Sequence, residues 1–168
     1  MKRTIVHGLA AFLVLALSLA AVAAKANFSG TWTLDKARSE GLPPELKAQT
    51  LTVVQTDDKL SIEASTVRES GEVKQSETYV LDGREMDYKP QPVMGYQGTG
   101  KRTASWGADG NSVNVKEVAT YDTPMGAANV NITRKWTLSA DGKTLTIEMT
   151  VESPQGTRQM KRVFTRSK

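Results

Sequence analysis

The segment Val130–Val151 reads VNITRKWTLSADGKTLTIEMTV and carries the clearest structural pattern in the chain. Apolar and polar residues alternate on both sides of Ser139–Gly142, which is the spacing of a β-strand with one buried face. The link ends in Asp141-Gly142, a pair that accepts the positive φ of a tight hairpin turn. The segment therefore predicts two antiparallel strands, near 130–138 and 143–152, joined by a tight turn.

The same rhythm extends over nearly the whole chain after residue 27 and predicts about ten strands. Residues 36–48 alone favour a helix, because Pro43-Pro44 suits a first turn and Glu45–Ala48 are good helix formers. The expected fold class is all-β: an antiparallel up-and-down β-barrel of about ten strands, with one short helical segment after the first strand. The strands are expected near 28–35, 49–56, 59–66, 73–81, 84–90, 100–107, 111–120, 130–138, 143–152 and 157–166.

The lengths of the connections alternate along this set of strands. Tight turns are expected at 57–58, 82–83, 108–110 and 139–142, and longer links at 36–48, 67–72, 91–99, 121–129 and 153–156. In an up-and-down meander the two groups lie at opposite ends, which predicts a closed base and an open mouth. The residues expected to face the interior are Leu34, Leu60, Ile62, Tyr79, Leu81, Val113, Val115, Ile132, Trp136, Leu145, Ile147, Met149 and Phe164.

The first 26 residues have the three parts of an export signal. Lys2 and Arg3 give a positive start, Gly8–Ala24 is an apolar run, and Ala24-Lys25-Ala26 offers small residues for cleavage. The competing interpretation is an uncleaved membrane anchor, but the run is short for a span and rich in Ala. We expect a signal peptide over 1–26, one domain over 27–168, a periplasmic or secreted product, and no stable membrane insertion after cleavage.

Composition excludes several classes of function. Removing residues 1–26 from the 168 leaves 142, and it reduces the 22 Lys and Arg to 19 against 18 Asp and Glu. A net charge of +1 argues against nucleic-acid binding, which needs a concentrated basic face. Cysteine is absent and the single histidine, His7, leaves with the signal. We therefore expect no metal site and no cofactor.

The same absences bear on catalysis. A mature chain without His or Cys has no imidazole base and no thiol nucleophile, so we do not expect an enzyme. Catalysis by carboxylates alone stays open, but no spacing singles out a pair among the strand acids Asp35, Glu63, Glu77, Glu117 and Glu148.

The two ends of the domain carry a family resemblance. Phe28–Leu34 reads FSGTWTL, and Lys161–Arg166 reads KRVFTR. The first resembles the Gly-x-Trp opening of the calycin superfamily, which comprises the lipocalins and the fatty-acid-binding proteins. The second resembles the last strand of these barrels. The whole is closest to small exported bacterial lipocalin-like proteins. The resemblance implies a calycin barrel whose base is plugged by Gly30, Trp32 and Arg166.

Two arginines are the candidates for orienting a ligand. Arg134 and Arg162 alternate with apolar residues, so both are expected to face inward, where a ligand carboxylate can neutralise them. The fatty-acid-binding proteins, which the chain resembles, place arginines on comparable late strands. Alternatively, each arginine pairs with an inward carboxylate such as Glu77 or stacks on Trp32. The other interior residues expected to contact a ligand are Trp136, Tyr79, Met149 and Phe164.

The segments 91–99 and 121–129 both contain Pro, Met and Gly. Their Met94, Tyr96 and Met125 suit an apolar entrance that adapts to different guests, or they cover the edge of the core. We expect an exported, non-enzymatic carrier of a small apolar or amphipathic, possibly anionic, molecule. The alternative is a solid barrel that binds a protein or an envelope polymer through loops 91–99 and 121–129.

Overall fold

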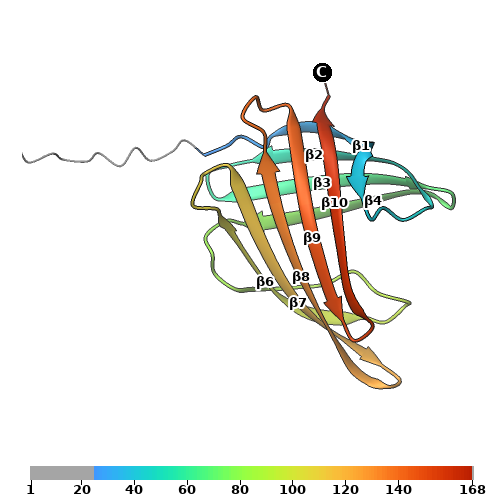
Figure 1. The fold of residues 1–168 in the computed structure, drawn as a ribbon. Helices are drawn as coiled ribbons and strands as arrows, with labels where there is room; N and C mark the ends of the chain where they lie inside the picture. The colour runs from blue at the N-terminus through green and yellow to red at the C-terminus, as the bar shows by residue number, and fades with distance from the viewer. Residues whose placement is uncertain (1–24, 168) are drawn as a thin grey trace, which may run out of the picture.

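The computed structural model describes residues 25–167, and these residues form ten β-strands in one antiparallel sheet (Figure 1). The predicted signal peptide over 1–26 lies, except for its last two residues, outside the described residues. The strands are β1 Gly30–Glu40, β2 Leu46–Gln55, β3 Lys59–Arg68, β4 Gly71–Val80, β5 Met86–Tyr88, β6 Gly98–Trp106, β7 Ser112–Thr123, β8 Gly126–Leu138, β9 Thr144–Ser153 and β10 Gly156–Arg166.

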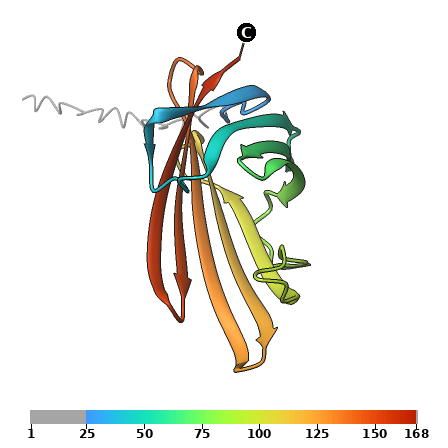
Figure 2. The same cartoon turned by 90° about the vertical axis from the view of Figure 1, so that its right-hand side faces the viewer.

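The strand order in the sheet is β4-β3-β2-β1-β10-β9-β8-β7-β6-β5. Neighbours along the chain pair with one another almost throughout, and the first and last strands pair through Trp32↔Arg166 and Leu34↔Phe164. Figures 1 and 2 show β1–β4 running across β6–β10, so that the sheet curves back over its own inner face. The prediction of an all-β, ten-stranded antiparallel meander is confirmed.

Closure of the barrel is not complete. β4 and β5 are the two ends of the strand order and do not pair with each other. Near the turn that follows β4, Asp82 forms an isolated bridge with Ser105 of β6. The sheet is therefore an open, strongly curved one.

The expected short helix is wrong, because no helix occurs within residues 25–167. β1 continues to Glu40, where it pairs with Lys161 of β10 after an irregularity in register. The hydroxyl of Ser39 accepts a hydrogen bond from the backbone N–H of Val163 at 2.9 Å, which ties this extension to β10. Local helix propensity is a weak term, and these long-range strand contacts override it.

The expected division into tight turns and roomy loops is also wrong. Three of the supposed long links are two-residue turns, at 69–70, 124–125 and 154–155, because the strands on either side continue further than the apolar pattern indicates. Each turn is followed by a glycine with φ between +106° and +122°, a conformation that suits glycine. The expected strand 84–90 is shorter than predicted, because β5 covers only three residues. Within the described residues, 89–97 is therefore the one connection between strands that is longer than five residues.

The core lies at the end of the sheet that holds the Gly30–Leu34 segment. Trp32 is fully buried and its indole Nε1 donates to the carbonyl of Phe28 at 2.9 Å. The guanidinium of Arg166 lies 4.2 Å from the centre of the Trp32 ring. It also donates to the carbonyl oxygens of Asn27, Ser29 and Gly142. Trp32 of β1 and Arg166 of β10, which are far apart in the sequence, thus close this end of the sheet together.

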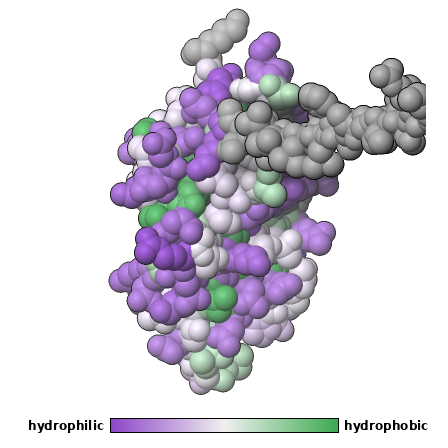
Figure 3. All heavy atoms as spheres, turned by 90° about the vertical axis from the view of Figure 1, so that its left-hand side faces the viewer, coloured by the Kyte–Doolittle hydropathy of each residue, from purple (hydrophilic) through white to green (hydrophobic). Residues whose placement is uncertain are grey.

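The remaining interior follows the alternation of the strands. All the residues expected to face inward are buried except Ile132 and Met149, which are half-buried. The opposite side chains face solvent, and the outer face in Figure 3 is mostly hydrophilic with small apolar patches. Between residues 25 and 167 there is no helix capable of crossing a membrane.

Candidate functional site

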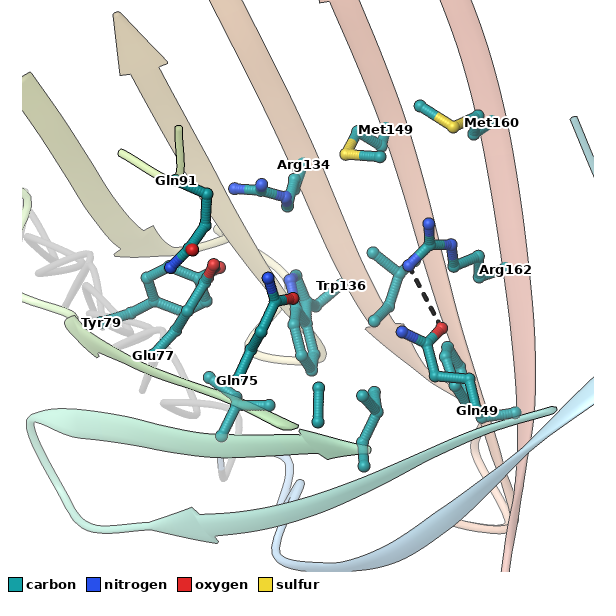
Figure 4. Close-up of a pocket in the computed structure, with 15 residues that line it drawn as sticks. Gln49, Gln75, Glu77, Tyr79, Gln91, Arg134, Trp136, Met149, Met160 and Arg162 are labelled. Carbon is teal, nitrogen blue, oxygen red and sulfur yellow. Dashed lines mark hydrogen bonds between the residues drawn. The ribbon is translucent and has the colours of Figure 1, made fainter. Parts of the chain in front are cut away.

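A cavity of about 270 Å³ lies on the inner face of the curved sheet (Figure 4). At about 30 Å³ for each water molecule, this volume holds about nine groups of that size. It lies just below the range of about 300–1,000 Å³ that is common for small-molecule pockets. The interior is therefore hollow, but it suits a small guest. The lining residues are Gln49, Leu51, Ile62, Ala64, Gln75, Glu77, Tyr79, Gln91, Arg134, Trp136, Ile147, Met149, Met160, Arg162 and Phe164.

The polar groups of the wall gather at two separate places. Figure 4 shows Arg162 and Gln49 on one side of the cavity, and Gln75, Glu77 and Gln91 on the other. Apolar side chains of β2, β3, β9 and β10 supply most of the surface between them. The cavity thus has an apolar middle and two polar ends.

Arg162 forms the first polar end. Its neighbours at alternate positions of β10, Met160 and Phe164, also line the cavity, so the strand itself directs the guanidinium inward. Nη1 donates to the side-chain oxygen of Gln49 at 3.1 Å, while Nε is buried without a hydrogen-bond partner. No carboxylate within residues 25–167 pairs with this side chain. Burial lowers the pKa of Arg162, and Arg134 and Arg68 lower it further.

Arg134 has a different environment, although it also lines the cavity. Its Nη1 donates to Oε2 of Glu117, a carboxylate whose side chain is only 1% exposed. The other oxygen of Glu117, Oε1, accepts a hydrogen bond from Nε of Arg102 at 2.5 Å and forms an ion pair with Nη2 of the same guanidinium. Glu117 alternates with buried Val115 and Ala119 on β7, which explains its inward position. The charge of Arg134 is therefore balanced within the protein.

Arg102 links this buried network to the edge strand β4. Its guanidinium lies between two tyrosine rings, 4.7 Å from the centre of Tyr79 and 4.3 Å from that of Tyr88. Nη2 lies 3.7 Å from Oε2 of Glu77, and Nη1 donates to the carbonyl of Thr78 at 3.4 Å. These contacts join β6 to β4 across the gap between the two edge strands, β4 and β5, which do not pair.

Glu77 and Tyr79 form the second polar end together with the two glutamines. The hydroxyl of Tyr79 donates to Oε2 of Glu77. Burial raises the pKa of Tyr79 well above its ordinary value, so this hydroxyl stays protonated and remains a donor.

Trp136 lies between the two polar ends (Figure 4). The residue is 4% exposed, and its ring meets that of Tyr79 edge-on with 6.2 Å between the ring centres. The indole Nε1 is buried without a hydrogen-bond partner. Trp136 therefore contributes the apolar part of its ring, and not its N–H, to the middle of the cavity wall.

The structure gathers most of the predicted ligand-contacting residues at one cavity. Its lining includes Arg134, Arg162, Trp136, Tyr79, Met149 and Phe164. The three loop residues Met94, Tyr96 and Met125 do not line it, and Met94 and Met125 are 91% and 98% exposed.

Sequence reasoning missed two partners of these groups, and it left the partner of Arg134 unnamed. Gln49 stands two residues before Leu51, Arg102 two before Ala104, and Glu117 two after Val115, so strict alternation indicates that all three face inward. The sequence does not indicate which inward-facing charged side chains pair with one another, because the pairing depends on the stagger between strands.

No protein-family model matches the chain, and no curated protein sequence matches it. Several solved structures resemble it, including the following two. One is the zebrafish ileal bile acid-binding protein in complex with cholic acid, with 16% identity and a TM-score of 0.49, covering 83% of this chain and 98% of that one. The other is the secretory abundant heat soluble protein 4 of Ramazzottius varieornatus, with 15% identity and a TM-score of 0.50, covering 86% and 98%.

At these identities the comparison concerns the fold alone. The expected closeness to exported bacterial lipocalin-like proteins stays a prediction. The second similarity shows that the overall fold of this chain, a curved meander of ten antiparallel strands, resembles that of a solved structure.

Proposed function

We propose that this protein is an exported, non-enzymatic carrier that holds a small anionic amphiphile in the cavity beneath Arg162. The observation that supports the proposal is the guanidinium of Arg162. It faces the cavity, has a buried Nε without a partner, and bonds only to the neutral amide of Gln49. Arg134, by contrast, already has Glu117 as its counter-ion.

A buried charge without a counter-ion is costly, and it is retained where another molecule supplies the opposite charge. A carboxylate in the cavity can accept hydrogen bonds from the two terminal nitrogens of one guanidinium at the same time. The apolar middle of the cavity then removes the body of the guest from water, at ~25 cal/mol for each Å². The volume favours a guest of about ten non-hydrogen atoms, for which octanoate is a suitable probe.

The proposal also states that the protein is exported and that it is not an enzyme. Export rests on the sequence of residues 1–26, and the absence of catalysis rests on the ion pairs of the inward carboxylates. The signal-like residues 1–26 support export to the periplasm or the medium. Both inward carboxylates, Glu77 and Glu117, are held by arginines, which leaves no free pair to act as acid and base.

The test is a titration of the purified mature protein with octanoate, followed by calorimetry and by tryptophan fluorescence. Loss of a charge-assisted hydrogen bond costs about 1.5–3 kcal/mol, so Arg162→Gln should weaken binding by roughly 10- to 150-fold. The matched control is Arg158→Gln, an exposed arginine of the same strand, which should leave the Kd unchanged.

Fluorescence separates binding in the cavity from binding elsewhere. The chain has three tryptophans, of which Trp136 lines the cavity, so Trp136→Phe should remove most of the signal change. Arg162→Gln should also melt at the same temperature as the parent or higher, because it removes a buried charge. The proposal is wrong if the parent does not bind octanoate, or if Arg162→Gln binds it as tightly.

A second candidate function has one observation in its favour. Met94 and Met125 are 91% and 98% exposed on two turns, and apolar side chains that form one exposed patch mark contact surfaces. This favours a module that binds a protein or an envelope polymer through loops 91–99 and 121–129. Labelled protein should then sediment with isolated cell envelopes, and the double variant Met94→Ser, Met125→Ser should not.

A further inference from the structure

We infer that the guest is polar at both ends: an anionic group at Arg162 and a neutral hydroxyl at Glu77. This deepens the proposed function and rests on it. The inference starts from the second polar end of the cavity, which a purely apolar tail does not complement.

Glu77 presents one free oxygen to the cavity. Oε2 accepts the Tyr79 hydroxyl and lies 3.7 Å from Arg102, whereas Oε1 forms no hydrogen bond within residues 25–167. The side chain is 34% exposed, and Figure 4 shows its carboxylate directed toward the cavity. A carboxylate oxygen is an acceptor only, so this position calls for a donor.

Gln75 and Gln91 flank this carboxylate (Figure 4). Both line the cavity, and no hydrogen bond involves either side-chain amide among the described residues. An amide offers both a donor and an acceptor. A hydroxyl placed here can donate to Glu77 and accept from one of the glutamines, which uses both of its capacities.

An apolar tail at this end is disfavoured. It would cover Oε1 of Glu77 and the two amides without replacing their hydrogen bonds to water, and a polar group that loses such a bond is destabilised. The cost is larger for the charged carboxylate than for the amides.

An ammonium group is disfavoured for a different reason. Glu77 belongs to a four-residue network in which the charges of Arg102 and Arg134 balance those of Glu77 and Glu117. Arg134 also lines the cavity beside this end. An added cation would meet two guanidiniums, whereas a hydroxyl adds no net charge.

The test compares three classes of probe at two chain lengths. The probes are hexanoate and octanoate, their ω-hydroxy forms, and their ω-amino forms, each titrated calorimetrically into the mature protein. We expect the better-fitting hydroxy acid to bind about tenfold more tightly than the plain acid of the same length, and the amino acids to bind more weakly than the hydroxy acids. A factor of ten corresponds to one hydrogen bond to a charged group.

Glu77→Gln keeps the shape of the side chain and removes its charge. It should lower the preference for the hydroxy acid to about threefold or less, in part by strengthening binding of the plain acid, because the apolar end of that acid then covers a neutral amide instead of a charge. Gln91→Ala lies outside the ionic network, and it should lower the preference without affecting the melting temperature. Glu63→Gln, an exposed acid on the outer face of β3, is the matched control and should change nothing.

Each outcome has a distinct meaning. If the plain acid binds and the hydroxy acid binds no better, the two-ended guest is wrong while the proposed carrier stands. The same holds if both variants keep the full preference, or if the amino acids bind as tightly as the hydroxy acids. If none of the probes binds, the proposed function is wrong and this inference fails with it.

Discussion

Glu117→Gln is the substitution with the largest expected effect on stability. The wild-type carboxylate is 1% exposed and bonds to two guanidiniums, those of Arg102 and Arg134, whose side chains are 9% and 18% exposed. The amide has nearly the same shape, so the substitution removes charge without leaving a hole. Both arginines then remain in the interior, with only the more distant Glu77 to balance them.

Breaking a buried ion pair by removing one partner costs about 3–5 kcal/mol. For a domain of about 140 residues, the unfolding entropy is about 0.3 kcal/mol/K, so the melting temperature should fall by about 10–17 °C. The assay is denaturant unfolding with a fixed slope, checked by a thermal scan. Adding Arg134→Met to Glu117→Gln should restore part of the loss, because it removes one of the uncompensated cations.

Glu63→Gln on the outer face of β3 is the control and should change stability by less than about 0.5 kcal/mol. A loss below about 1 kcal/mol for Glu117→Gln would refute the reasoning. It would mean that water or a shift of the arginines replaces the carboxylate. A double variant that is less stable than Glu117→Gln would also refute it.

Three further results are expected. Gly30→Ala should lower stability by about 1–3 kcal/mol in denaturant unfolding, because φ is +136° and the new methyl would lie 2.7 Å from Nη1 of Arg166. The hydrogen bond from Ser112 holds the pKa of Asp109 below its ordinary value. The ionised carboxylate therefore stabilises the fold at a pH above its ordinary pKa, and this contribution disappears as the pH falls through the folded pKa. The melting temperatures of Asp109→Asn and the parent should accordingly differ at about pH 6 and converge as the pH falls through the folded pKa of Asp109. Met125→Ser should leave both the melting temperature and octanoate binding unchanged, since this side chain is 98% exposed and away from the cavity.

The sequence predicts the features that depend on contacts between neighbouring residues, and it misses those that depend on contacts between distant residues. The alternation of Leu145, Ile147 and Met149 is local, and it predicts β9 to within one residue at each end. The same signal indicates that Arg134 and Arg162 face inward. The helix expected over 36–48 is wrong because its propensity is local, whereas the contacts that keep the chain extended come from β10.

The difference between the two arginines is beyond the sequence for a related reason. Both alternate with apolar neighbours, and both look equally free to bind an anion. The stagger of β7 against β8 sets Glu117 within reach of Arg134, while the position of β10 beside β1 leaves Arg162 only Gln49. If one strand shifted by two residues against its neighbour, the same side chains would still face inward. Each inward arginine would then lie beside a different residue.

The pairing of β1 with β10 has a consequence for how the chain is made. Arg166 completes the cover over Trp32 and bonds to Ser29, which lies 137 positions earlier in the sequence. During synthesis this corner stays unfinished until Arg166 has emerged, however early the central hairpins form. Contacts between such distant positions slow folding, and deletion of β10 would leave the indole of Trp32 without this cover.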